Sequence, residues 1–172
     1  MFSLTALFVA ASAATAVMAH TITLTNNCGS SVPVYVDSAY SPVAYTGAQP
    51  GTIGAGSSVA ITLPTGWNSR ICHNADGKNC ADGATVDSMS EFNLDSGGLD
   101  YYDISNIEGY TIAQEIVAHG TSSFGGCGTV ECTSASCACS QAYPVGDPSG
   151  CGDDAPVKSC PSAGDFTITY CP

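Results

Sequence analysis

The chain has 172 residues, with 15 acidic side chains against only 3 Lys and Arg, which gives a formal net charge of -12 at pH 7. Such a chain has no basic face for nucleic-acid phosphates and is repelled by anionic lipid, so neither nucleic acid nor membrane is expected as a partner. Charged residues are only 10% of the chain and apolar residues 44%. This balance excludes a disordered acidic tail and predicts a packed globular protein.

The N-terminal segment predicts secretion. Residues 2–19 form an apolar, Ala-rich run, and Val17 and Ala19 meet the small-residue requirement for cleavage after Ala19. An uncleaved anchor is the alternative, but the run has a low density of Leu and Ile and no stop-transfer charges follow it. We therefore expect residues 1–19 to be a secretory signal peptide and residues 20–172 to form one extracellular domain.

Short segments with alternating polar and apolar residues follow the predicted cleavage site. This period of two is typical of half-buried strands, and it covers residues 21–25, 32–36, 58–63 and 166–170. Gly, Pro, Ser and Asn clusters separate the segments, and no sustained 3.6-residue apolar period occurs. The pattern predicts an all-β fold, an antiparallel β-sandwich.

All 10 cysteines follow the predicted signal peptide. An even count in a secreted chain predicts five disulfides formed in an oxidising compartment. Zinc bound near Cys132, Cys137 and Cys139 is a weaker alternative, because the chain has no Cys-x-x-Cys pair and its histidines are scattered. Most cysteines lie late in the chain, which predicts a disulfide-rich satellite over about residues 121–160.

Three segments of the chain stand out: residues 90–110 with their Asp-Tyr-Tyr-Asp-Ile-Ser core, Asn26-Asn-Cys28 and Tyr170-Cys-Pro172. The first resembles the central segment of the thaumatin-like, pathogenesis-related protein family, and the other two resemble the chain ends that this family joins by a disulfide. The cysteine count is similar to that of the small members. The resemblance implies a flattened antiparallel β-sandwich with a reduced satellite. It also implies binding of β-1,3-glucan-type cell-wall polysaccharide, with weak endo-β-1,3-glucanase or antifungal activity.

The resemblance further implies a disulfide pairing for most of the cysteines. The implied bonds are Cys28–Cys171, Cys72–Cys80, Cys127–Cys160 and Cys132–Cys151. Cys137 and Cys139 are then left over, and because a bond between residues two apart is strained, their pairing stays open.

An acidic cleft is the functional feature that the resemblance implies. Its expected lining residues are Arg70, Glu91, Asp103, Glu108 and either Asp153 or Asp154. Two carboxylates in one cleft are the minimum equipment for glycoside hydrolysis, since one donates a proton to the leaving oxygen and the other stabilises the sugar cation or activates water. If the protein is an enzyme, we expect Glu91 to be the acid and Asp103 the base or nucleophile. Non-catalytic binding, or a structural role, is the equal alternative.

Aromatic residues near these positions suit a sugar ligand, because aromatic faces pack against sugar C–H surfaces. The residues are Trp67, Tyr101, Tyr102 and Tyr110. Ordinary core or turn packing is the favoured explanation for each of them. Tyr101 and Tyr102 are neighbours on a predicted strand, so at most one of them faces the cleft.

His20 carries a different hypothesis. Cleavage after Ala19 makes it the first residue, and its α-amine and imidazole can chelate copper as in lytic polysaccharide monooxygenases, with His73 or His119 as the second ligand. Otherwise no cofactor is expected. A third hypothesis is a non-catalytic defence or effector protein that acts on a protein partner. We expect a monomer in each case.

Overall fold

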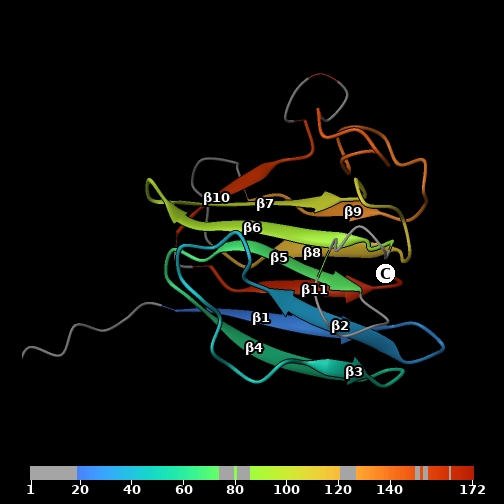
Figure 1. The fold of residues 1–172 in the computed structure, drawn as a ribbon, viewed down its shortest axis with the longest axis horizontal. Helices are drawn as coiled ribbons and strands as arrows, with labels where there is room; N and C mark the ends of the chain where they lie inside the picture. The colour runs from blue at the N-terminus through green and yellow to red at the C-terminus, as the bar shows by residue number, and fades with distance from the viewer. Residues whose placement is uncertain are drawn as a thin grey trace, which may run out of the picture.

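The computed structural model describes residues 19–73, 80, 86–120, 127–149, 152, 155–162 and 164–172. Within these residues the chain forms strands and connecting loops, with no α-helix. The strands (Figure 1) are β1 (Ala19–Asn26), β2 (Val32–Asp37), β3 (Gly51–Ile53), β4 (Ser58–Pro64), β5 (Asn68–His73), β6 (Met89–Ser96), β7 (Leu99–Ser105), β8 (Gln114–Ala118), β9 (Val130–Cys132), β10 (Lys158–Pro161) and β11 (Phe166–Tyr170). The predicted all-β class is confirmed.

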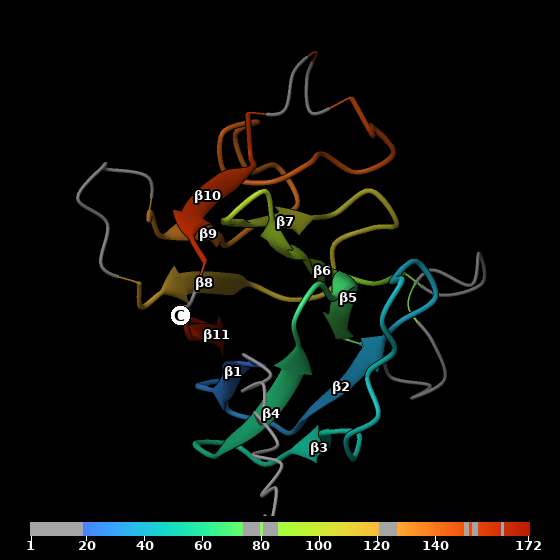
Figure 2. The same cartoon turned by 90° about the vertical axis from the view of Figure 1, so that its left-hand side faces the viewer.

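The strands form two sheets that face each other. One sheet has the order β4-β1-β11-β8-β9 and the other has the order β10-β7-β6-β5-β2-β3. Figure 2 shows them from the side, with β8, β11 and β1 on the left and β6, β5 and β2 on the right. The described strand pairs are antiparallel except β1 and β11, which run parallel.

The four strands predicted from alternating residues are confirmed as β1, β2, β4 and β11. In β1 the side chains of Ile22 and Leu24 are fully buried, while Thr21 and Thr23 between them are only partly buried. The alternation arises because successive side chains of a strand point to opposite faces of the sheet. The apolar set therefore faces the second sheet.

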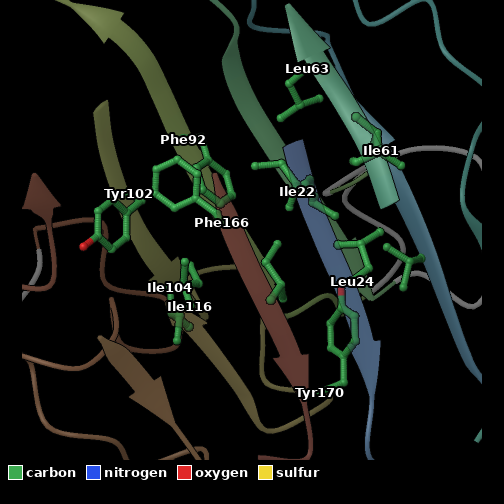
Figure 3. Packing of buried hydrophobic residues seen from close by; sticks show 14 of the residues in the cluster. Ile22, Leu24, Ile61, Leu63, Phe92, Tyr102, Ile104, Ile116, Phe166 and Tyr170 are labelled. Atoms are coloured by element: carbon green, nitrogen blue, oxygen red, sulfur yellow. The ribbon is translucent and has the colours of Figure 1, made fainter. Parts of the chain in front are cut away.

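Aromatic rings from both sheets meet at the centre of the core (Figure 3). The Phe166 ring lies edge-on to Phe92 and to Tyr102, with 5.2 Å between ring centroids in each pair. Trp67 is fully buried beside Phe92. Edge-on aromatic pairs contribute about 0.5–1.5 kcal/mol each beyond the area that they bury, so this cluster joins the two sheets.

The side chains that the six-stranded sheet buries in the core determine which side chains lie on its outer face. Val36, Ile71, Ser90 and Ile104 lie on one cross-strand row and are buried toward the core. Their chain neighbours must point away from the core because of the two-residue period. The candidate site lies on this outer face.

The expected disulfide pairing is partly confirmed. Cys28–Cys171, Cys72–Cys80 and Cys127–Cys160 are bonded as the family resemblance implies. Such bonding is typical of proteins that fold in an oxidising compartment.

The implied Cys132–Cys151 bond is wrong. Cys132 instead bonds Cys137, because a turn in which the Cys137 amide donates to the Ser134 carbonyl brings the two Cα atoms to 5.7 Å. Cys139 is also disulfide-bonded, and Cys151 lies outside the described residues. No described cysteine keeps a free thiol, so the zinc alternative at Cys132, Cys137 and Cys139 is wrong as well.

The predicted satellite extends both sheets where it is described. β9 pairs with β8 at the edge of one sheet, and β10 pairs with β7 at the edge of the other. Of the predicted signal peptide, only Ala19 is among the described residues, at the start of β1. In the part of the chain that the structure describes, no helix is long and apolar enough to cross a membrane.

Candidate functional site

Four charged residues form one row across the outer face of the six-stranded sheet. Asp37 on β2 pairs with Arg70 on β5, Arg70 pairs with Glu91 on β6, and Glu91 pairs with Asp103 on β7. Residues directly opposite each other in antiparallel strands point to the same face and lie close together. We call this set the charged row. It brings together three residues that the sequence placed in the cleft, Arg70, Glu91 and Asp103.

The charged row forms part of a cavity of about 580 Å³, which we call the cleft. Arg70, Glu91 and Asp103 line it together with Tyr101. A second row, Asn68–Asn93–Tyr101, runs beside the charged row on the same face. Further lining comes from the loop residues Tyr40, Ile107, Tyr143 and Pro148 and from Val157.

Arg70 is held firmly at one end of the charged row. Its Nε atom lies 3.7 Å from Asp37 Oδ2, and its Nη1 contacts Met89 Sδ at 3.8 Å. The guanidinium carbon lies 4.3 Å from the centre of the Tyr40 ring, which is cation–π geometry. These contacts fix the arginine beside Glu91.

Glu91 has the electrostatics of a proton donor. Burial raises the pKa of its carboxyl group, the positive charge of Arg70 and the Ser105 side chain lower it, and the charge of Glu108 raises it again. The net effect is a pKa above the ordinary value of 4.5. A carboxyl group shifted in this direction stays protonated to a higher pH, as a general acid requires.

Other predicted site residues lie elsewhere. Glu108 is exposed in the turn after β7 and is not among the residues that line the cleft, so it acts on the site only through its charge. Asp153 and Asp154 lie outside the described residues.

The placement of Tyr102 in the cleft is wrong. Its side chain is fully buried between the sheets, where its hydroxyl donates to the Gly128 carbonyl. The reason is the two-residue period of β7, which turns Tyr101 outward and Tyr102 inward. Trp67 is likewise a core residue, and its indole N–H donates to Ser38 Oγ at 3.1 Å. Tyr110 is not among the lining residues.

His20 lies in a separate buried cluster with Asp95 and Asp100. Its Nδ1 donates to the Gly164 carbonyl at 2.9 Å, and its Nε2 donates to Asp95 Oδ2 at 2.9 Å. Asp100 Oδ2 lies 3.7 Å from Nδ1 and is fully buried. Both ring nitrogens face acceptors, so the arrangement is that of a doubly protonated ring.

Burial works against this charge, but the Gly164 carbonyl and the carboxylates of Asp95 and Asp100 outweigh it and raise the pKa of His20 above 6.5. A histidine and two carboxylates within 4.8 Å of one another also have the composition of a metal site. A doubly protonated ring has no lone pair to give to a metal. The ring faces neither His73 nor the exposed His119, whose Nε2 bonds Thr167. The geometry therefore does not support the copper hypothesis.

Sequence reasoning missed several residues that line the cleft or, like Asp37, lie beside it in the charged row. Asp37 directly follows the predicted strand 32–36, so its position was visible, but its place beside Arg70 depends on strand register. Asn68 and Asn93 come together for the same reason. Tyr40 and Tyr143 reach the cleft from loops, for which the sequence carries no signal.

Fold and site together define an all-β, disulfide-bonded protein with a charged cleft on the outer face of one sheet. No protein-family model matches the chain, and no curated protein matches it either.

Proposed function

We propose that this chain is a secreted, small thaumatin-like protein that binds β-1,3-glucan-type cell-wall polysaccharide in the cleft. One observation carries the proposal. Arg70, Glu91 and Asp103, which the sequence resemblance assigns to an acidic cleft, are cross-strand neighbours that line a single cavity. The disulfides and the Ala-rich N-terminal run support secretion.

The cleft has the composition of a sugar site. Its volume of about 580 Å³ falls in the common range of ligand pockets, about 300–1,000 Å³. Tyr101 offers a ring face for the sugar C–H surface, while Asn68 and Asn93 offer amide groups for hydroxyls. Binding of this kind would bring the protein to a fungal cell wall, which is the basis on which we include antifungal activity in the proposal.

Weak hydrolysis is the second part of the proposal. Glu91 and Asp103 are directly opposite each other, and such pairs have Cβ atoms about 4.5–5.5 Å apart. A close pair of carboxyl groups favours the retaining route, in which the second carboxylate attacks the sugar and water later releases it. Glu91 donates the proton, because burial raises the pKa of its carboxyl group, and Asp103 is the nucleophile.

The test measures binding and hydrolysis side by side. Purified protein is incubated with insoluble β-1,3-glucan, and both the bound protein and the newly formed reducing ends are measured. The variant is Glu91→Gln, which removes the acid with little change in shape. The matched control is Glu131→Gln on β9, which makes the same change on an exposed residue of the other sheet.

We expect wild type and Glu131→Gln to bind glucan and to release reducing ends slowly. Glu91→Gln should lose the release by about 100-fold or more, the range for a general acid. Glucan binding with release that Glu91→Gln does not change would leave binding as the function and remove the enzyme. No binding by wild type would overturn the proposal and favour a protein partner.

A further inference from the structure

The second row of side chains, which lies beside the charged row on the outer face of the six-stranded sheet, is uncharged. Asn68 on β5 pairs with Asn93 on β6, and Asn93 pairs with Tyr101 on β7. Tyr101 in turn pairs with Ser159 on β10, so the second row continues to the edge strand of the sheet (Figure 1). Direct partners in antiparallel strands point to the same face. The four side chains therefore form one continuous polar row.

The side chains of the second row are accessible to a ligand. Asn68 is exposed, and Asn93, Tyr101 and Ser159 are half-buried. Among the described residues, none of these four side chains has a hydrogen-bond partner, since the bond from Asn68 to Ser41 Oγ comes from the main-chain amide. Two amides, a phenol and a hydroxyl can each donate and accept hydrogen bonds. This chemistry recognises the hydroxyl groups of an uncharged sugar chain.

The length of the second row determines how much of a sugar chain it can hold. Neighbouring strands lie about 4.8 Å apart, so a row across four strands spans about 14 Å. This span is longer than a disaccharide. Tyr101 lies inside the row and offers a ring face on which sugar C–H surface packs. The second row thus has one stacking position with polar side chains on both sides of it.

We infer that the second row holds an uncharged glucan chain, which lies across strands β5, β6, β7 and β10 with one sugar ring on Tyr101. This inference rests on the proposed polysaccharide-binding function and specifies which residues select the chain and in which direction it lies. Asn68 and Ser159 bind hydroxyls at the two ends of the row, and Asn93 binds beside Tyr101. Because the two rows run side by side, the bound chain passes next to Glu91.

The experiment compares a short chain with one long enough to cover the second row. The disaccharide and the hexasaccharide of β-1,3-linked glucose are titrated separately into the protein by calorimetry. The variants are Asn68→Ala and Ser159→Ala at the two ends of the row and Tyr101→Ala inside it. Asn27→Ala is the matched control, because Asn27 is exposed directly after β1 of the other sheet. Urea unfolding checks that each variant is folded.

We expect the hexasaccharide to bind about tenfold more tightly than the disaccharide or better, because only the longer chain reaches all four side chains. Tyr101→Ala should weaken hexasaccharide binding by about tenfold, the range for a lost aromatic contact. Asn68→Ala and Ser159→Ala should each weaken it by about fivefold, the range for one hydrogen bond. A disaccharide cannot reach both ends of the row, so at most one of these two variants should weaken its binding. Asn27→Ala should change neither affinity.

Three results would overturn the inference and leave the proposed function standing. Equal affinity for the disaccharide and the hexasaccharide would show that one short subsite does all the binding. Hexasaccharide binding that neither Asn68→Ala nor Ser159→Ala weakens would show that the chain lies in another direction or on another face. Binding of insoluble β-1,3-glucan without binding of the hexasaccharide would exclude a site for a single chain. If wild type binds neither the oligosaccharides nor the insoluble glucan, the proposed function fails together with the inference.

Discussion

At the scale of single residues, His20 is a closely held ionisable group outside the cleft. It is only 2% exposed and donates from both ring nitrogens, while the Asp100 carboxylate beside it is fully buried. Asp95 is held in turn by the Gly66 amide and donates its own amide to Asp100. This network links β1 of one sheet to the turn between β6 and β7 of the other sheet. The charge of the His20 imidazole therefore contributes to the contact between the two sheets.

Replacing His20 by Gln should therefore have a pH-dependent effect on stability. The folded-state pKa of His20 is raised, so its contribution is fully present below the unfolded-state value of 6.5 and is lost as the pH rises through the raised pKa. Below pH 6.5 the substitution should cost about 3 kcal/mol, since it leaves buried carboxylates without their partner. Urea unfolding of both proteins across the pH range measures the gap, which should narrow toward alkaline pH.

His119→Gln is the matched control, because His119 is exposed and its Nε2 atom bonds the Thr167 hydroxyl. It should change stability by less than about 0.5 kcal/mol. A gap between wild type and His20→Gln that stays constant or widens with rising pH would contradict the charged-ring assignment.

At the scale of elements, the hairpin of β6 and β7 positions the cleft. Its turn has two glycines, Gly97 and Gly98, between the paired Ser96 and Leu99, and both have positive φ angles, 62° and 85°. A two-residue turn of this type matches the twist of the strands and requires residues that tolerate positive φ. The pairing of Glu91 with Asp103 depends on the register that the hairpin adopts.

Gly98→Ala should destabilise the protein by about 1–2 kcal/mol, because an L-residue pays that cost in the left-handed region. An added Cβ at Gly98 meets no neighbour within 4 Å, so the loss of stability comes from the positive φ angle and not from a steric clash. Gly29→Ala is the control, since its added Cβ is equally free and its φ lies outside the left-handed range. Equal urea midpoints for the two variants would show that the turn imposes no such strain.

At the scale of the whole molecule, the Cys28–Cys171 bond joins the two ends of the described chain. It follows the parallel pair β1 and β11 in the interior of the five-stranded sheet and closes a separation of 143 residues. The Cys72–Cys80 bond closes a separation of only 8. If chain entropy dominates, the longer closure restricts the unfolded chain far more.

The double variant Cys28→Ala/Cys171→Ala should lose about 5 kcal/mol of unfolding free energy, and Cys72→Ala/Cys80→Ala about half as much. The first loss is a large share of the stability of a single domain, which is about 5–15 kcal/mol. Denaturant unfolding of the two variants under oxidising conditions measures the difference. A smaller loss for the first pair than for the second would rule out loop closure as the main contribution.

The sequence by itself determined the all-β class, four of the strands and three of the disulfides, as well as three cleft residues. Strand positions such as residues 21–25 can be predicted because the period of two is a local property of the chain. The cysteine pairs and the cleft residues came from resemblance. Where local geometry differs from the family, as at Cys132, resemblance was wrong, because a short turn brought Cys137 nearer.

Tertiary structure alone decided which residues share the charged row. Asp37 meets Arg70, and Glu91 meets Asp103, only through the register of separate strands, and a shift by one residue would turn each side chain to the other face. It also decided that Tyr102 packs in the core and that His20 is buried with two carboxylates. The acidic excess was visible in the composition, but the placement of Glu91 and Asp103 in one cleft depends on how separate strands pair. Local patterns do not encode such contacts.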